Sequence, residues 1–261
     1  MGTKLIRLAD NFWNIRGSFK MGGLIDVGTQ SSLVQLANGR FVFLDAYTLD
    51  GGVREEIDQL THGGERVEAV LNLHPFHTLH VEPMYAMYPQ AAIYGTARHR
   101  SRFPDLPWEK INTEDPRLHA RFADDFDFSV PRGVDFISAN EHIHFSSVLA
   151  YHRSSSTIHV DDTLMYVHLP GLLRTLGIDS PVSFHPTLAR ALEKRAGAAR
   201  DFRAWVGELA KRWQGAENLC AAHTATLTAQ INRRGPPIPE RILSALDKVK
   251  KVLDGHQEKY G

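Results

Sequence analysis

The sequence predicts an α/β fold in which two β-sheets are covered by helices. Two observations lead to this prediction. Runs of strand-like residues fill the first third of the chain and recur in the middle, while the last third has helical spacing. This order fits two sheets with helices packed outside them. The 261 residues are enough for a sizeable hydrophobic core.

The first third of the chain predicts a hairpin, two short helices and two further strands. Asn38-Gly39 is a tight-turn signal between two β-rich runs. The run RVEAVLNL is typical of a buried strand, and glycines bound the helical stretch before it. In chain order we expect a hairpin over 31–46, a helix over Val53–Leu60, strands over 66–73 and 91–99, and a helix over Met84–Tyr88 between these two strands.

The middle of the chain predicts three strands after an irregular region. The region 104–127 is rich in Pro, Asp and Arg, and we expect an excursion or a lid over 99–133. The turn signal RSSS joins the last two strand-like runs into a hairpin. The three expected strands are GVDFIS (133–138), HFSSVLAYH (144–152) and STIHVDDTLMYV (156–167).

The last third predicts helices around one short strand. Residues 185–213 have helical spacing with an apolar stripe, and 239–254 form a second amphipathic pattern that Pro239 opens. Between them, GAENLCAAHTA is an apolar strand that ends at His223. C-terminal helices are therefore expected within 187–254.

Composition excludes several classes of protein. Lys+Arg and Asp+Glu both number 30, so neither nucleic acid nor a membrane surface is expected as a partner. No apolar run is long enough to span a bilayer, and the N-terminal residues do not resemble a signal peptide. The single cysteine, Cys220, allows no intrachain disulfide, so we expect a cytoplasmic location.

Histidine is unusually frequent, with 14 residues, and three of them form a candidate metal site. In VLNLHPFHTLHVEP, His74, His77 and His80 follow a buried strand at intervals of three. On a helical turn His77 and His80 share one face, and imidazoles at this spacing can converge on zinc or iron. The alternative is that a polar helix start carries these histidines without a function.

A second set of candidate ligands lies at the ends of the RSSS hairpin. His142 and His144 come at the start of its first strand, and Asp161 and Asp162 at the end of its second. The hairpin places these ends side by side, as a transition-metal site requires. A turn or helix cap is the alternative role for the two aspartates. His223 closes the series at the end of the last strand.

This order of residues resembles the metallo-β-lactamase superfamily. SSLVQLANGRFVFLDA is similar to the opening hairpin of that family, which ends in an aspartate, here Asp45. VLNLHPFHTLH is similar to its T-H-x-H-x-D-H signature, TIHVDDTLMYV to its GDTL segment, and CAAHTA to its last histidine. The resemblance covers nearly the whole chain and implies a single domain over 1–261, folded as a four-layer αββα sandwich.

The resemblance also implies a ligand set, with two departures from the signature. The implied metal ligands are His74, His77, His80, His144, Asp162 and His223, with His142 as the alternative to His144. A gapless match puts Pro75 at the first signature histidine and Leu79 at the signature aspartate. That aspartate helps to hold the second metal ion in hydrolases of the family, so these departures weaken the case for two-metal chemistry.

We therefore expect a metal-dependent hydrolase of a small-molecule ester, lactone or thioester that acts through a metal-activated water. Zinc is the expected metal, with iron or manganese as alternatives and one or two ions bound. Asp162 and His80 are the expected catalytic residues. The alternatives are an iron-binding oxidoreductase of the same fold and a degenerate, non-catalytic member. Segment 99–133 either covers the mouth of the site or forms a contact in a homo-oligomer.

Overall fold

A computed structural model describes residues 3–21, 25–26, 28–166, 181–222 and 225–261 of the chain. It divides into two compact units, each described separately below. Unit 1 comprises Met1–Phe128 and His152–Ser155, and unit 2 comprises Ser129–Tyr151 and Ser156–Gly261.

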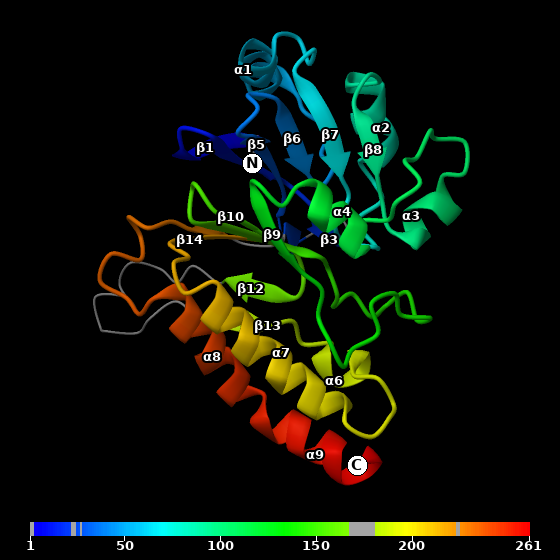
Figure 1. Cartoon of the computed structure of the whole chain (residues 1–261), viewed down its shortest axis with the longest axis vertical. Helices are drawn as coiled ribbons and strands as arrows, with labels where there is room; N and C mark the ends of the chain where they lie inside the picture. The colour runs from blue at the N-terminus through cyan, green and yellow to red at the C-terminus, as the bar shows by residue number, and fades with distance from the viewer. Residues whose placement is uncertain (1–2, 22–24, 27, 167–180, 223–224) are drawn as a thin grey trace. The chain divides into compact units, whose positions relative to one another are not determined.

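Unit 1 is built on a six-stranded sheet whose strand order is β1-β2-β5-β6-β7-β8. Its strands are β1 (Lys4–Ala9), β2 (Phe12–Gly17), β5 (Thr29–Gln35), β6 (Phe41–Leu44), β7 (Val67–Leu71) and β8 (Ala92–Tyr94), with β3 (Lys20–Met21) and β4 (Ile25–Asp26) as a separate pair. Its helices are α1 (Gly51–Thr61), α2 (Val81–Met87), α3 (Ala97–Arg102) and α4 (Pro116–Arg121), all labelled in Figure 1. Strand β9 (Phe126–Ser129) lies at the boundary with unit 2.

The sheet of unit 1 changes from antiparallel to parallel at β6. The pairs from β1 to β6 are antiparallel, whereas β6–β7 and β7–β8 are parallel. The predicted hairpin is confirmed, with Gly39 at φ 82° in its turn. Its apolar side chains join a buried core that includes Leu33, Phe43 and Ile57, and each such side chain contributes about 1.5–3 kcal/mol on burial. The carboxyl ends of β6, β7 and β8 consequently meet at one edge of the sheet.

Unit 2 contains most of a five-stranded sheet with strand order β15-β14-β11-β10-β9. Its strands are β10 (Leu149–His152), β11 (Thr157–Val160), β14 (Asn218–Ala221) and β15 (Thr226–Leu227), with β12 (Leu164–Tyr166) and β13 (Val182–Phe184) as a separate antiparallel pair. Its helices are α6 (Leu188–Ala191), α7 (Ala198–Arg212), α8 (Ile238–Lys248) and α9 (Lys250–Tyr260). Helices α7 and α8 run side by side, and α9 carries the C-terminus (Figure 1).

The core of unit 2 confirms the predicted amphipathic pattern of the last third. Phe202, Trp205 and Leu209 of α7 are buried against β-strand residues such as Ile158 and Leu219. Strands β11 and β14 pair in parallel, with Val160 opposite Ala221. The ends of these two strands therefore lie at the same edge of the sheet.

Several predicted boundaries are wrong for identifiable physical reasons. The pattern over 185–213 is not one helix, because α6 ends at Ala191 and Gly197, at φ 81°, caps the start of α7. The pattern over 239–254 contains a break at Val249 between α8 and α9. Residues 133–138 form no strand beyond a single bridge of Val134 to Leu192.

Two further boundaries differ near the candidate ligands. The helix expected over Met84–Tyr88 begins at Val81, and Pro83 is tolerated because it lies in the first turn. The strand expected over 144–152 begins only at Leu149, so His142 and His144 lie in irregular chain before it. Segment 99–133 contains the end of α3, all of α4 and β9.

Gly133 explains why its segment is not a strand, and it gives a stability prediction. Its φ is 75°, and a Cβ there would lie 2.1 Å from the carbonyl oxygen of Ala198. Gly133→Ala should therefore lower the free energy of unfolding by about 2–4 kcal/mol in urea titrations, from backbone strain and overpacking. Gly207→Ala is the control: it adds a Cβ to α7 where no atom lies within 4 Å, so stability should rise slightly. Equal effects of the two variants would contradict this account.

His152 gives unit 1 a predicted pH dependence. It is buried between the rings of Phe12 and Phe126, with Nδ1 2.7 Å from Ser155 Oγ. Burial lowers the pKa of His152 from 6.5 to about 4, with a smaller contribution from Arg153. Between these pH values the unfolded chain binds the extra proton, so stability falls as the pH falls through this window.

His152→Gln should therefore flatten the pH dependence of the unfolding free energy. As the pH falls from 6.5 to about 4, the free energy of unfolding of the wild-type chain should decrease by about 3 kcal/mol through this histidine. The variant should not show this decrease. Urea titrations at several pH values in a chelating buffer measure the difference. His62→Asn, at an exposed position, is the control and should run parallel to the wild type. Parallel curves for His152→Gln would contradict the prediction.

No helix in the described part of the chain is long and apolar enough to cross a membrane.

Candidate metal centre

The candidate residues of unit 1 gather at the carboxyl edge of its parallel strands. Asp45 follows β6, His74 lies three residues after β7, and Thr96 follows β8 by two. In parallel sheets, side chains beyond the carboxyl ends of the strands converge, which is why such edges hold ligand sites. The histidine loop, residues 72–80, begins at this edge.

Asp45 fixes the start of the histidine loop. Its Oδ1 accepts hydrogen bonds from the backbone N–H groups of Leu73 at 2.8 Å and His74 at 3.3 Å. Its own backbone N–H donates to Leu71, and its carbonyl accepts from the Ser31 hydroxyl. Asp45 is buried at φ 62°, a conformation that Asp and Asn tolerate better than most residues. This aspartate therefore holds the backbone that carries His74.

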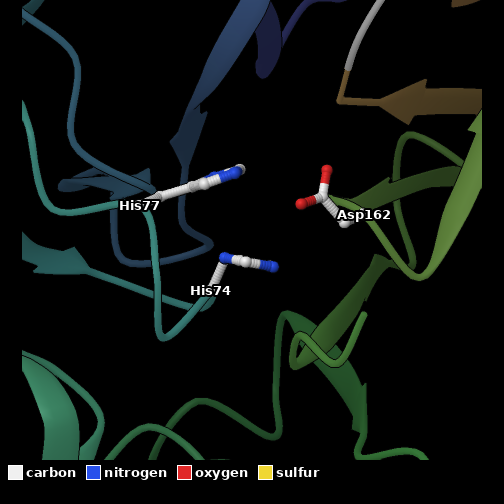
Figure 2. A group of neighbouring side chains, drawn as sticks. All are labelled: His74, His77 and Asp162. Atoms are coloured by element: carbon white, nitrogen blue, oxygen red, sulfur yellow. The ribbon is translucent and has the colours of Figure 1, made fainter. Parts of the chain in front are cut away.

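His74 and His77 form a ring pair within this loop. A turn brings them together, since the His77 N–H donates to the His74 carbonyl at 3.1 Å. Their ring centroids are 4.0 Å apart, and each offers a nitrogen within 4.8 Å of the other. Figure 2 shows both side chains extending from the loop that follows β7. The pair that meets is thus His74 with His77, whereas the sequence predicted a shared helical face for His77 and His80.

The ring of His74 is oriented by its own loop. Its Nδ1 accepts a hydrogen bond from the Phe76 N–H at 3.2 Å, which leaves Nε2 as the nitrogen to face an ion. A neutral ring that accepts at Nδ1 carries its proton on Nε2. Binding of a metal at Nε2 would therefore require the ring proton to move to Nδ1 and the contact with the Phe76 N–H to open.

His99, which the sequence did not single out, supports His77. Its Nδ1 accepts from the Thr96 N–H at 3.2 Å, so Nε2 carries the proton and donates to the His77 carbonyl at 3.3 Å. Burial lowers the pKa of His99 to about 4, so the neutral form is retained. The capping box of α3, with Thr96 and His99, is the sequence signal that could have identified this residue.

The ring of His80 does not join the His74–His77 pair and contacts Tyr47 and Thr48 instead. It is the N-cap of α2, its Nδ1 lies 2.8 Å from Thr48 Oγ1, and its ring packs 4.7 Å from that of Tyr47. Burial, and then the nearby His77, lower the pKa of His80. The loop after β6 therefore positions His80, and Tyr47 and Thr48 are contacts that sequence spacing did not indicate.

At the predicted rim of unit 2, the Thr163 side chain links the segments before and after the RSSS turn. The Thr163 hydroxyl donates to the Phe145 carbonyl at 2.8 Å, and the Ser147 N–H donates to Thr163 Oγ1 at 3.1 Å. The neighbours of these residues, His144 and Asp162, are thereby brought to one rim, as predicted. The His144 ring itself contacts the Glu141 carbonyl through Nε2. Asp162, drawn in Figure 2, follows β11 and is buried.

His159 and Asp161 form a second donor pair in unit 2, and the sequence assigned His159 no role. Both are buried, and each offers a ligand atom within 4.8 Å of the other. Their spacing of two residues at the end of β11 places both side chains on one face, which is the signal that could have found them. Burying Asp161 beside Asp162 is costly unless donors or a cation neutralise the charge.

Two further predicted positions remain. His223 lies outside the described residues, directly after Ala222, whose N–H donates to the Val160 carbonyl at 3.0 Å. His142 is exposed, with its backbone N–H bonded to Asn140.

The donor chemistry of each unit fits a transition-metal ion. A tetrahedral zinc with bonds of ~2.1 Å separates two ligand nitrogens by roughly 3.4 Å, which is compatible with the spacing of His74 and His77. Imidazole and carboxylate oxygens together are a donor set that zinc, iron and manganese accept.

Solved structures with the same fold include three metallo-β-lactamases. An enzyme from Erythrobacter litoralis, with β-mercaptoethanol in its active site, is 11% identical, with a TM-score of 0.60 over 95% of this chain and 97% of that chain. The enzyme from Hirschia baltica is 10% identical, with a TM-score of 0.56 over 94% and 98%. FIM-1 from Pseudomonas aeruginosa, in a mono-zinc form, is 10% identical, with a TM-score of 0.54 over 95% and 96%.

No protein-family model matches the chain, and no curated protein sequence does. The structural matches confirm the predicted fold class, the α/β fold of the metallo-β-lactamase type. At these identities they establish the fold and leave the activity to be argued from the site.

Proposed function

We propose that this chain is a metal-dependent hydrolase that cleaves an ester, lactone or thioester bond in a small-molecule substrate. The observation that carries the proposal is the His74–His77 ring pair, held at the carboxyl edge of a sheet by Asp45. A pair of imidazoles on a fixed loop beyond a strand end is a preorganised half of a metal site. The fold supports the same reading, since one solved metallo-β-lactamase carries a single zinc.

The proposed metal is zinc, with iron and manganese as alternatives. His74 and His77 supply two ligands, and His144 and His223 are the proposed further ligands. His80 and Asp162 also belong to the sequence-predicted set, and they are assigned the catalytic roles given below. One ion is favoured over two because Leu79, at the position of the signature aspartate, has no donor atom and is 68% exposed. The single cysteine supports a cytoplasmic location.

The residues of the site have separate proposed roles. Zinc held by these residues would supply Lewis acidity, the chemistry that activates a water near neutral pH and polarises a carbonyl. Asp162 accepts the proton that the attacking water loses. His80, oriented by Thr48 and Tyr47, exchanges a proton with the leaving group. His99 holds the backbone of His77 in place.

Chelation and reconstitution test this proposal. The purified chain is stripped of metal, reloaded separately with zinc, manganese and iron, and assayed on a panel of aryl esters, a lactone and an acyl thioester. Hydrolysis that disappears on chelation and returns with one metal supports the proposal. If the protein binds iron, shows a visible absorption band and hydrolyses none of the substrates, an iron-binding oxidoreductase would replace the hydrolase as the proposed function. No hydrolysis of any compound of the panel, with or without metal, would indicate a non-catalytic member of the fold.

A further inference from the structure

We propose that unit 1 carries a second ligand site, away from the histidine loop, and that this site binds a free amino acid with a cationic side chain. The site is a cavity of about 640 Å³, which we call the turn cavity. Cavities of this size commonly hold small-molecule ligands. The residues that line it are Asn11, Gln35, Leu36, Ala37, Gly39, Asp124, Asp125, Arg153 and Ser154.

The turn cavity lies at the opposite end of β6 from the candidate metal site. Gly39 comes before the first residue of β6, whereas Asp45 and the histidine loop follow its last residue. The length of β6, roughly 10 Å for four residues of a strand, separates the two places. The cavity is lined by the turns after β1, β5 and β10 and by the two residues before β9. A ligand bound there would therefore not occupy the metal site.

Hydrogen bonds between these segments fix the walls of the turn cavity. Asp125 Oδ1 accepts from the Ala37 N–H at 2.7 Å, and the Asp125 carbonyl accepts from the Arg153 N–H at 3.1 Å. Asn11 Nδ2 donates to Ser154 Oγ at 2.5 Å. Walls that are fixed in this way lose little conformational freedom when a ligand binds, which favours recognition.

Three charged side chains of the turn cavity have atoms available for a ligand. Asp124 forms no hydrogen bond or ion pair with any residue that the structure describes, and the Asp125 carboxylate uses only Oδ1. Arg153 donates through Nη1 to the Ala123 carbonyl, and within the described chain its Nε and Nη2 groups have no acceptor. Two carboxylates and one guanidinium thus line the same cavity without pairing with one another.

The arrangement of these charges selects the class of ligand. The Nε and Nη2 groups of Arg153 form one edge of the guanidinium, and such an edge donates two parallel hydrogen bonds to a carboxylate. The carboxylates of Asp124 and Asp125 attract ammonium or guanidinium groups. An amino acid with a cationic side chain carries two cationic groups and one carboxylate, so its charges complement those of the cavity.

Titration calorimetry with three ligands tests the proposal on the wild-type chain. L-lysine should bind, because it carries all three charged groups. L-norleucine lacks the side-chain ammonium group and 1,5-diaminopentane lacks the carboxylate, so each should bind at least about fivefold more weakly. Equal affinities for the three compounds, or no binding of L-lysine, would overturn the proposal.

Substitutions locate the bound amino acid. Arg153→Met should weaken L-lysine binding about tenfold, and Asp124→Asn should weaken it about fivefold. Asp124 is exposed and asparagine has nearly the same shape, so Asp124→Asn decides the question if Arg153→Met is unfolded by circular dichroism. Wild-type affinity in a folded Arg153→Met and in Asp124→Asn would reject the turn cavity as the binding site.

Two control variants separate the turn cavity from the rest of unit 1. Asp105→Asn removes an exposed aspartate outside the cavity, and His77→Ala removes a candidate metal ligand. Both should bind L-lysine with wild-type affinity. If His77→Ala weakened binding and Arg153→Met did not, the amino acid would be a ligand of the metal site and the proposal would be wrong.

A divalent cation is the other ligand that two neighbouring carboxylates could bind. Titration with calcium chloride, alone and in the presence of L-lysine, distinguishes the two ligands. L-lysine binding that is unaffected by calcium would support the amino-acid site. Tighter binding of calcium that displaces L-lysine would make the turn cavity a cation site and reject the proposal.

Discussion

Replacing His77 with alanine should reduce zinc affinity by roughly 100-fold or more and abolish metal-dependent hydrolysis. His74→Ala should have the same effect, because the two rings form one pair and neither ring alone holds an ion tightly. Competition with a chromophoric chelator measures the affinity, and a coupled ester assay measures activity. Thermal unfolding in the presence of chelator should change little for His77→Ala, because the His77 side chain is only half-buried.

The control for these variants is His62→Asn. His62 is an exposed histidine at the C-cap of α1, so its replacement should leave zinc affinity at the wild-type value. Undiminished zinc affinity in both His74→Ala and His77→Ala would show that the ring pair is not the metal site.

Asp45→Ala is expected to have the second large effect, although Asp45 is not among the predicted ligands. Removing its carboxylate leaves the backbone N–H groups of Leu73 and His74 without their acceptor in a buried position. The free energy of unfolding should fall by about 2–4 kcal/mol. Because the loop that carries His74 loses its anchor, zinc affinity should also fall by roughly 10–100-fold. Urea titration and chelator competition measure the two effects.

Asp45→Asn separates hydrogen bonding from charge. Asparagine keeps Oδ1 as an acceptor and tolerates the positive φ of 62° at this position. This variant should therefore retain most of the stability that Asp45→Ala loses. If Asp45→Asn were as unstable as Asp45→Ala, the negative charge of Asp45 would be the stabilising property. If Asp45→Ala bound zinc with wild-type affinity, the anchoring role of Asp45 would be wrong.

Local signals in the sequence were sufficient for much of the fold. Asn38-Gly39 specifies a tight turn through its backbone preferences alone, and the hairpin around it is present. The apolar run before His74 predicts a buried strand, and β7 is one. The helix break at Val249 was missed because Leu246, Val249 and Leu253 continue the apolar spacing through it, whereas the break before α7 lies at Gly197, in a stretch without large apolar residues. Tertiary packing, rather than local pattern, decides where such helices end.

The site was predictable in its residue types and less so in its geometry. The interval of three paired His77 with His80 on a helical turn, yet the turn after β7 closes on His77 and α2 starts only after His80. Spacing along the chain does not indicate which of two neighbouring rings will meet. Asp45 and His99 act through backbone groups of other segments, and such contacts depend on strand order, which the sequence did not provide.

The central claim is that the histidine loop binds a metal ion, and metal content tests it most directly. Inductively coupled plasma mass spectrometry is applied to wild-type protein and His77→Ala, each purified without chelator from medium supplemented with zinc, manganese and iron. The wild-type protein should retain one metal ion per chain after desalting, and His77→Ala should retain almost none. Wild-type protein without metal, or equal metal in both proteins, would contradict the claim.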